Sequence, residues 1–429
     1  MRQWMVAAKK ADFYAIAEKF HVDPVVARII RNREVIGEKN IRIYLGGNLS
    51  DLSDPHQMKD MDRLVEILAQ KIRKQAHIRI IGDYDVDGVT SSHLFLTALR
   101  RVGAKVDVVI PHRIQDGYGL SLHLLQQAKE DGVDTILTCD NGIAAIDEIA
   151  WAKAQKMTVL VTDHHAVPFE EHEGRRTEKK SLADAVVNPH QQDCRYPYKE
   201  LCGAGVAWNV IRVLYENYDM DKREAEDLLD FVAMATVCDV MSLTGENRIL
   251  VKEGLKRIRH TKNIGLQALM QACNVQPENI SAYHFGYVLG PCVNATGRLD
   301  TARHALRLFE TGQETEAEEI ARDLVDLNQE RKELTLQGVE MAKKLCEEGG
   351  YENDPILVLF LPDVHESIAG LIAGRIREMY NRPVFVLTRG EEGVKGSGRS
   401  TENYSMYENM CGCAELFTKF GGHPMAAGL

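Results

Sequence analysis

Acidic residues follow three strand-like runs of the sequence, and two histidines accompany the last of them. The first cluster places alternate aspartates in the segment GDYDVDG, the second is a single aspartate before Asn-Gly, and the third is Asp-His-His. Carboxylate oxygens with an occasional imidazole are the ligands that hard divalent cations such as Mg²⁺ and Mn²⁺ prefer. The pattern therefore favours a metal centre built from Asp83, Asp85, Asp87, Asp140, Asp163, His164 and His165.

Helix capping is the competing interpretation of these aspartates. An aspartate after a strand is commonly an N-cap or turn residue, and for any single position capping is the commoner explanation. Capping does not readily account for three alternate aspartates, another aspartate at a later strand end and then Asp-His-His, so metal binding is favoured for the set. Asp239 is a further candidate, because an unpaired carboxylate in the apolar run ATVCDVMSL would be costly and a cation would remove that cost.

The elements that must position these residues are short strands alternating with amphipathic helices. This alternation predicts a doubly wound α/β fold, in which a mostly parallel sheet is covered by helices. The carboxyl ends of parallel strands line the crevice where ligands bind, so residues far apart in sequence should meet there. The expected strands are 77–81, 105–110, 135–139, 158–162 and 185–188, and the expected helices are 91–102, 121–130 and 144–154.

A second α/β unit is expected near the C-terminus. Residues 190–260 have a largely helical pattern, and segment 314–347 is charged, long and free of proline, which indicates a single connecting helix. The elements expected after it are a strand at 356–361, a helix at 368–380 and a strand at 384–387.

These patterns predict three parts along the chain. The first is residues 1–310, the second is a connecting helix, residues 311–349, and the third is a smaller domain, residues 350–429. Because the chain stops at Leu429 directly after a Gly-rich motif, we expect the third part to be incomplete.

Composition narrows the class of protein. The chain has 52 basic and 63 acidic residues and a formal net charge of −11, which argues against a surface coated for nucleic-acid binding but leaves a local basic groove open. Its nine cysteines include no CxxC pair, as is typical of a reduced cytosolic protein. No apolar run approaches the ~20 residues of a membrane-spanning helix. We therefore expect a cytoplasmic protein without a membrane segment.

The acidic clusters resemble the four motifs of the DHH phosphoesterase superfamily. The GDYDVDG form of the first motif resembles the RecJ branch, whose members are exonucleases specific for single-stranded DNA. The resemblance covers nearly the whole chain and implies a parallel-sheet DHH domain that is joined by a long helix to a smaller α/β domain of the DHHA1 type. Further segments that agree with this branch are 111–113 (PHR), 116–120 (DGYGL), 294–299 (NATGRL), 395–400 (KGSGRS) and 421–424 (GGHP).

The resemblance also implies a set of ligands for two cations, Mn²⁺ or Mg²⁺. Asp140 would be shared between them, Asp83 and Asp85 would complete the first site, and Asp87, His164 and Asp239 would complete the second. His165 would face the phosphate as a catalytic residue, and Asp163 would orient the histidine pair.

Three arginines are expected to bind phosphate, because a guanidinium group can bind phosphate oxygens in a bidentate way. An isolated arginine is more often a solvated surface residue. Here each arginine falls in a Gly-containing segment, expected to be a loop, that matches a RecJ motif. The resemblance implies a pocket for the terminal 5′-phosphate and a contact with the scissile or neighbouring phosphate; the pocket residues are Arg113, Arg298, Ser397 and Arg399, and the contact residue is His423.

The implied activity is a metal-dependent 5′→3′ exonuclease that degrades single-stranded DNA in repair and recombination. Two cations would lower the pKa of a water molecule and brace the reacting oxygens at phosphorus. Implied partners are single-stranded DNA with a 5′ end, a RecQ-type helicase and a single-strand-binding protein. The alternative is a DHH phosphodiesterase that acts on short oligonucleotides or small nucleotides. A catalytically inactive scaffold would show gaps in the acidic set, and this sequence has none.

Overall fold

The structure is a computed structural model of the chain, and it describes residues 9–113, 116–172, 175–351, 354–390 and 393–429. Its contacts divide it into two compact units. Unit 1 comprises Met1–Gly297 and Thr301–Arg322, and unit 2 comprises Arg298–Asp300 and Asp323–Leu429.

Unit 1 is built around a five-stranded parallel sheet in the order β2-β1-β3-β4-β7. The central strands IRII and TILTC are buried along their whole length, as expected where helices cover both faces of a parallel sheet. The doubly wound fold is confirmed, and each strand begins and ends within one residue of its predicted position. The strands are β1 (Ile78–Ile81), β2 (Val106–Val109), β3 (Thr135–Cys139), β4 (Thr158–Thr162) and β7 (Ala185–Val187), and a separate hairpin consists of β5 (Phe169–His172) and β6 (Arg175–Glu178).

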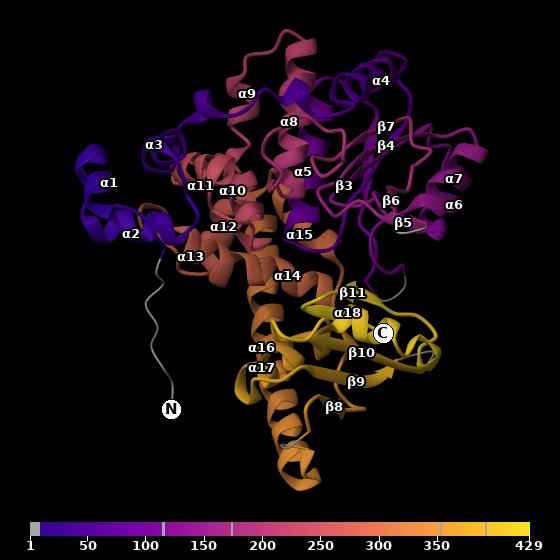
Figure 1. Cartoon of the computed structure of the whole chain (residues 1–429). Coiled ribbons are helices and arrows are strands. Elements are labelled where there is room, and N and C mark those ends of the chain that lie inside the picture. The colour runs from indigo at the N-terminus through magenta and orange to yellow at the C-terminus, as the bar shows by residue number, and fades with distance from the viewer. Residues whose placement is uncertain (1–8, 114–115, 173–174, 352–353, 391–392) are drawn as a thin grey trace. The chain divides into compact units, whose positions relative to one another are not determined.

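Helices lie on both sides of this sheet (Figure 1). On one side are α6 (Leu122–Glu130) and α7 (Ile146–Ala154), whose apolar residues share a buried core with β3 and β4. On the other side are α5 (Val86–Arg101) and α8 (Gly203–Asn217), which pack against each other. The sheet is therefore covered on each face by a layer of helices, and both of its faces are buried.

The remaining helices of unit 1 lie before the sheet and after β7. They include a π-helical turn, a feature that is often found at functional sites. They are α1 (Phe13–Phe20), α2 (Pro24–Asn32), α3 (Glu38–Gly46), α4 (Met61–Arg73), α9 (Arg223–Glu226), α10 (Leu229–Cys238), α11 (Gly245–Ile258), α12 (Ile264–Ala272), α13 (Ala282–His284), the π-helix Phe285–Leu289, α14 (Gly290–Leu299) and α15 (Ala302–Glu310).

The direction of winding reverses between β1 and β3. From β1 the chain moves outward to β2, and then returns to β3 on the other side of β1. At such a reversal the connections diverge and leave a crevice beyond the carboxyl ends of the strands. Asp83 follows β1 and Asp140 follows β3, so the topology places both at this crevice.

The start predicted for the first helix, residue 91, is wrong, because α5 begins five residues earlier. Asp85 is its N-cap, and the side chain accepts a hydrogen bond from Gly88 N at 3.1 Å. Capping and metal binding are therefore not exclusive for Asp85, because one carboxylate oxygen accepts this bond and the other is available to a cation. Asp87 is consequently in the first turn of a helix.

Unit 2 contains a second five-stranded sheet, in the order β11-β12-β10-β9-β8, in which only the β8–β9 pair is parallel. The predicted connecting helix is confirmed as α16 (Glu314–Gly349), whose C-terminal part contributes Val339 and Ala342 to the core of unit 2. The other elements are β8 (Leu357–Phe360), α17 (Ala369–Tyr380), β9 (Val384–Gly390), β10 (Gly393–Arg399), α18 (Met406–Cys411), β11 (Gly421–His423) and β12 (Ala426–Gly428).

The expectation that the arginines predicted to bind phosphate lie in loops is wrong at two positions. Arg298 lies in α14, and Arg399 is the last residue of β10. The glycines beside Arg399 are needed for close packing, since a Cβ at Gly396 would lie 2.4 Å from Leu387 and one at Gly398 would lie 2.3 Å from Met406. Such glycines look like turn residues in the sequence, although the backbone here pairs with β9 and β12.

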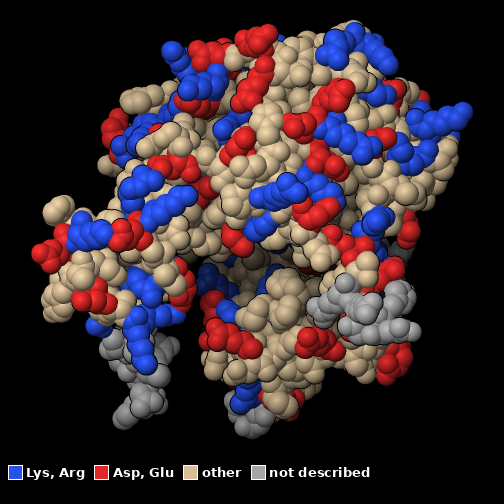
Figure 2. All heavy atoms as spheres, turned by 45° about the horizontal axis from the view of Figure 1, so that its top comes forward, with Lys and Arg blue, Asp and Glu red and all other residues tan. Residues whose placement is uncertain are grey.

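Charges of both signs are mixed on the face of the molecule shown in Figure 2. On this face, blue Lys and Arg side chains alternate with red Asp and Glu side chains over most of the area. This mixture agrees with the acidic net charge and favours local sites for anions over a broad basic surface. Among the described helices, none is long and apolar enough to cross a bilayer.

Candidate metal centre and phosphate-binding residues

Three carboxylates meet beyond the ends of β1 and β3. One oxygen atom from each of Asp83, Asp85 and Asp140 lies within 4.8 Å of the others. Asn141 joins the two strand ends, since its Nδ2 donates to Ile81 O at 3.0 Å and to Cys139 O at 2.9 Å. This bridge fixes the turn that presents Asp140 to the aspartates of the first motif.

A second group surrounds His164, which follows β4. Its Nε2 lies 3.7 Å from Asp87 Oδ2 and 3.7 Å from Asp239 Oδ2, and only 3.0 Å from Asp140 Oδ1. Asp87, His164 and Asp239 form a potential ligand group by the same 4.8 Å measure. Asp140 therefore lies beside both groups.

The first turn of α8 supports this cluster. Gly203 N donates to Asp87 Oδ2 at 2.6 Å and Ala204 N donates to Asp87 Oδ1 at 2.8 Å. A Cβ at Gly203 would lie 2.6 Å from Cβ of Asp140, so a larger residue would displace that side chain. Gly203 is not predictable from the sequence, in which its only signal is the small-residue segment GAG at the start of the helix.

The backbone is strained at two positions of the site. Asp140 has φ = 62°, and Val240, directly after Asp239, has φ = 59°. Positive φ is unfavourable for a residue with a side chain and is most unfavourable for a β-branched one. Strain of this kind persists where the surrounding structure enforces it, and it is common at functional sites.

The carboxylates repel one another in a buried space. Burial and then the neighbouring aspartates raise the pKa of Asp83, of Asp85 and of Asp140. Burial and the charge on Asp87 raise the pKa of Asp239 to about 8. Burial also lowers the pKa of His164, which keeps its imidazole neutral and able to donate a lone pair.

Several polar atoms of the site have no hydrogen-bond partner among the described residues. They are buried atoms, for which lost solvation is costly unless a partner compensates it. The atoms are Asp83 Oδ1, Asp140 Oδ1 and His164 Nε2. Two oxygens and one imidazole nitrogen, all left unsatisfied in an acidic cluster, fit the ligand preference of divalent cations.

Asp163 holds the histidine pair in place. Its Oδ1 accepts hydrogen bonds from His164 N at 2.7 Å and from His165 Nδ1 at 2.8 Å, and its Oδ2 accepts one from Ile143 N at 2.9 Å. Burial acts to lower the pKa of His165, but its hydrogen bond with Asp163 and the charges of Asp163, Asp239 and Asp87 together outweigh burial and raise that pKa to about 9. At neutral pH His165 is therefore a cation.

Tyr118 links His165 to the first carboxylate group. Its hydroxyl donates to the backbone O of Asp140 at 3.1 Å and lies 3.1 Å from His165 Nε2. The sequence predicted no such role, because a tyrosine in a Gly-rich segment has no spacing signal that connects it to a distant histidine. Arg113 lies over the ring of Tyr84, 4.5 Å from its centroid, in the same unit.

Unit 2 brings together two of the residues predicted to bind phosphate. Arg399 Nη1 donates to Ser397 Oγ at 3.2 Å and to the backbone O of Gly398 at 2.7 Å. Gly370, in the first turn of α17, faces them: a Cβ there would lie 2.8 Å from both Arg399 Nη2 and Ser397 Oγ. His423 is exposed in β11, on the same sheet as Arg399.

Comparison with known proteins identifies both parts of the chain. The N-terminal domain of the DHH family matches residues 77–236, and the DHHA1 domain matches residues 353–429. The first match contains the aspartate and histidine motifs from Asp83 to His165, and the second contains Arg399 and His423.

Two relatives and one solved structure are similar over nearly the whole chain. The single-stranded-DNA-specific exonuclease RecJ of Haemophilus influenzae is 36% identical over 424 residues, which cover 95% of this chain and 71% of that protein. RecJ of Bacillus subtilis is 34% identical over 417 residues, and the match covers 97% of this chain and 51% of that protein. The crystal structure of RecJ from Thermus thermophilus in complex with Mn²⁺ has a TM-score of 0.81 and 29% identity, and the match covers 97% of this chain and 58% of that one.

The chain thus spans about half the length of the Bacillus relative. Similarity at this level extends over both units, including the sheet that carries the acidic cluster and the sheet that carries Arg399. The chain belongs to the RecJ family of DHH phosphoesterases.

Proposed function

We propose that this chain is a metal-dependent exonuclease that hydrolyses single-stranded DNA from its 5′ end. The observation that carries the proposal is the position of Asp140 beside both groups of ligands, with its Oδ1 3.0 Å from His164 Nε2 and both of these atoms unsatisfied among the described residues. The activity of the RecJ relatives supports the choice of substrate.

The donor atoms fit two divalent cations. Asp83 and Asp85 would hold one and Asp87, His164 and Asp239 would hold the other, with Asp140 shared. Burial and mutual repulsion raise the pKa of these carboxylates, and divalent cations would supply compensating positive charge. A pair of such cations lowers the pKa of water and stabilises negative charge at phosphorus.

The remaining chemistry falls to side chains of the chain itself. His165, held in its cationic form by Asp163, would place a positive charge beside the scissile phosphate. Tyr118 would keep the imidazole in position through its contact with Nε2. Asp163 is a positioning residue, because its two oxygens are occupied by hydrogen bonds from 143 and 164–165.

The direction of degradation would depend on recognition of the 5′-phosphate. We infer that Arg113, Arg298, Ser397 and Arg399 bind that group and that His423 contacts the scissile or an adjacent phosphate. Arg399 and Ser397 support this inference, since they already place a guanidinium group and a hydroxyl side by side. A site that accepts only a chain end would make the enzyme an exonuclease.

Unpaired bases would find aromatic partners on unit 1. Tyr283 and Tyr287 are 62% and 73% exposed, and their rings stack with centroids 5.2 Å apart. Exposed rings of this kind are suited to stacking on bases, which stabilises single-strand binding by about 1–3 kcal/mol per base.

We further propose that the protein acts in the cytoplasm in DNA repair and recombination, with a RecQ-type helicase and a single-strand-binding protein as partners.

A comparison of substrates tests the proposal. Single strands of increasing length, a blunt duplex and two- to five-nucleotide oligomers are incubated with Mn²⁺ or Mg²⁺, and the products are resolved on a sequencing gel. The proposal predicts that long single strands are degraded and that the duplex is resistant. Degradation restricted to the shortest oligomers would instead support a phosphodiesterase of the oligonucleotide branch.

A further inference from the structure

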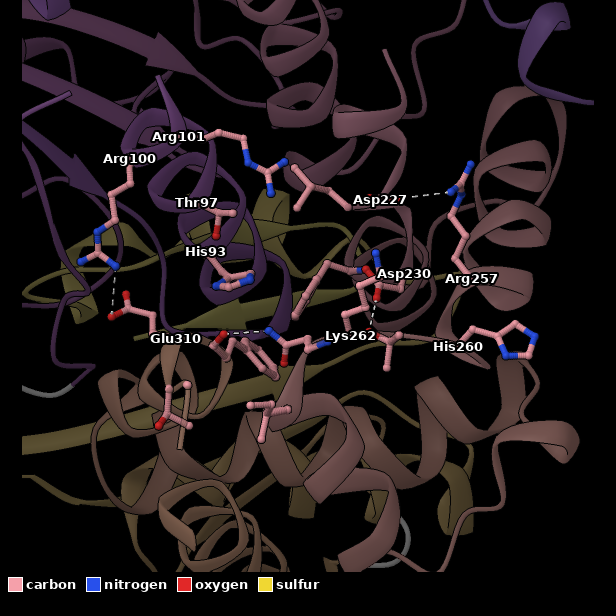
Figure 3. Close-up of a pocket in the computed structure, with 18 of the residues that line it drawn as sticks. His93, Thr97, Arg100, Arg101, Asp227, Asp230, Arg257, His260, Lys262 and Glu310 are labelled. Atoms are coloured by element: carbon pink, nitrogen blue, oxygen red, sulfur yellow. Dashed lines mark hydrogen bonds and ion pairs between the residues drawn. The ribbon is translucent and has the colours of Figure 1, made fainter. Parts of the chain in front are cut away.

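A second pocket lies in unit 1 among α5, α10, α11, α12 and α15, and has a volume of about 870 Å³ (Figure 3). Its size is within the range of about 300–1,000 Å³ that is usual for small-molecule sites. The described residues that line it include none of the proposed metal ligands or phosphate-binding residues. The function proposed above leaves this pocket without a role.

The inner wall of the pocket is aromatic and contains an unsatisfied histidine. His93 is only 5% exposed, and its ring centroid lies 4.4 Å from that of Phe231 and 5.8 Å from that of Phe309. Its Nδ1 has no hydrogen-bond partner among the described residues, although burial of such an atom is costly. Figure 3 shows this imidazole in the middle of the labelled side chains.

Other groups of the inner wall can also form hydrogen bonds. Glu310 has a buried Oε1 that lacks a partner within the described part of the chain. Asp230 accepts a hydrogen bond from Thr261 Oγ1 at 2.7 Å, and burial raises its pKa to about 6. Burial lowers the pKa of His93 to about 3, so that its ring is neutral and offers one donor and one acceptor. Flat rings with adjacent donors and acceptors are suited to a nitrogen heterocycle.

The pocket is also lined by basic residues. Lys262 makes no ion pair with any described residue, and it precedes the N-cap of α12, Asn263, which also lines the pocket. Arg100 is 3.9 Å from Glu310, a distance too long for a hydrogen bond. A lysine next to the positive end of a helix is a favourable environment for a phosphate group. The other basic residues of the lining are Arg101, Lys256, Arg257 and His260, and the first three of these form ion pairs with Glu224, Glu253 and Glu226.

We propose that this pocket binds a nucleoside monophosphate, with the base against His93 and Phe231 and the phosphate near Lys262. An apolar ligand would leave the His93 nitrogen and the Glu310 oxygen unsatisfied, and inorganic phosphate would make no use of the aromatic wall. A ligand that has both a polar aromatic base and a phosphate group would satisfy both parts of the pocket. This site is separate from the proposed nuclease function and does not depend on it.

The pocket shares two helices with the acidic cluster. α5 carries both Asp87 and His93, which are six residues or about 9 Å apart along the helix. α10 begins beside the pocket with Asp230 and Phe231 and ends next to Asp239. A nucleotide in the pocket would therefore contact both helices that carry proposed ligands of the second cation.

Isothermal titration calorimetry on the whole chain tests the site. The four deoxynucleoside monophosphates are titrated in EDTA, which prevents binding through divalent cations, and deoxyadenosine and inorganic phosphate are titrated separately. We expect saturable binding of one nucleotide per chain. The affinity for deoxyadenosine alone or inorganic phosphate alone should be lower by about tenfold or more. Equal affinity for inorganic phosphate, or no binding of any nucleotide at millimolar concentration, would overturn the proposal.

Variants locate the binding. Lys262→Glu and His93→Phe should each weaken it about tenfold, since each removes one contact to the phosphate or the base. Lys332→Glu, an exposed charge reversal on α16, is the matched control and should change nothing. Arg399→Ala and Asp140→Asn should also leave binding unchanged, and loss of binding in either would place the nucleotide in the proposed phosphate pocket or metal centre and refute the second site. If His93→Phe is less stable than the parent chain, Lys262→Glu alone decides.

Discussion

The Nε2 atom of His164 and the Oδ1 atom of Asp140 lie 3.0 Å apart, yet within the described residues neither makes a hydrogen bond. The two atoms come from the ends of neighbouring parallel strands, β3 and β4, and meet because those strands are in register. Both atoms are buried, so their lost solvation is uncompensated in the protein alone. A shared cation would compensate it.

Asp140→Asn should abolish activity and uncouple metal binding from stability. Loss of a carboxylate shared by both cations removes several kcal/mol of transition-state stabilisation, so the rate should fall about a thousandfold. In the parent chain Mn²⁺ should raise the melting temperature, and in the variant most of that rise should be lost. Differential scanning fluorimetry with and without Mn²⁺ measures this, and an undiminished rise would show that Asp140 is not a ligand.

A methyl group at position 370 should weaken recognition of the 5′-phosphate. The Cβ of Gly370→Ala would lie 2.8 Å from the side chains of Arg399 and Ser397 and would displace them. We expect KM to rise about tenfold for a 5′-phosphorylated strand and to stay unchanged for a 5′-hydroxyl strand, because a charged hydrogen bond is lost only in the former.

Gly374→Ala is the matched control on the same helix. A Cβ at Gly374 has no heavy atom within 4 Å, so this variant should retain the parent KM. If Gly370→Ala raises KM equally for the 5′-phosphorylated and the 5′-hydroxyl strand, Arg399 and Ser397 do not bind the terminal phosphate.

Arg79 should be a stabilising residue of the sheet and not part of the site. On β1 it donates from Nε and Nη2 to Asp107 at 2.9 and 2.7 Å, and from Nη1 to Asp131 at 2.8 Å. Arg79→Met should lower the free energy of unfolding by about 2 kcal/mol, since Asp107 is left partly buried with only His77 as a partner. Lys59→Met breaks an exposed pair with Asp193 and should cost under about 1 kcal/mol. Urea denaturation of both variants measures the difference.

Asp230 should make stability depend on pH in an identifiable direction. Its pKa is about 6 in the folded chain, above its usual value of 3.8, because of burial. The folded state therefore binds this proton more tightly than the unfolded state does. The stability that this difference contributes is complete below pH 3.8 and is lost as pH rises through 6. Asp230→Asn should thus match the parent near pH 4 and exceed its stability by about 2 kcal/mol at pH 7.5.

Denaturation in EDTA between pH 4 and 8 tests this prediction. The difference between variant and parent isolates Asp230, because all other titrating groups are common to both chains. A difference that does not grow between pH 4 and 7.5 would show that the carboxyl is not destabilised by burial.

The sequence predicted the sheet because its strands are short β-branched runs separated by helical periods. It predicted the acidic set because alternation at 83, 85 and 87 has no common structural cause. It could not predict the role of Gly203 or Gly370, since the need for glycine there arises from side chains distant in sequence. The loop prediction at Arg399 failed for the same reason. Glycine is needed at 396 and 398 because Leu387 and Met406 pack against the backbone there, and the sequence alone does not show that these side chains are close.

Digestion of one long single strand, labelled at either its 5′ or its 3′ end, tests the central claim most directly. The account predicts that, with Mn²⁺ or Mg²⁺, the 5′ label is released as a mononucleotide from the first time point while the 3′ label remains on progressively shorter strands, and that EDTA or Asp140→Asn abolishes both. Release of the 3′ label first, internal cleavage, or digestion that persists in EDTA would contradict it.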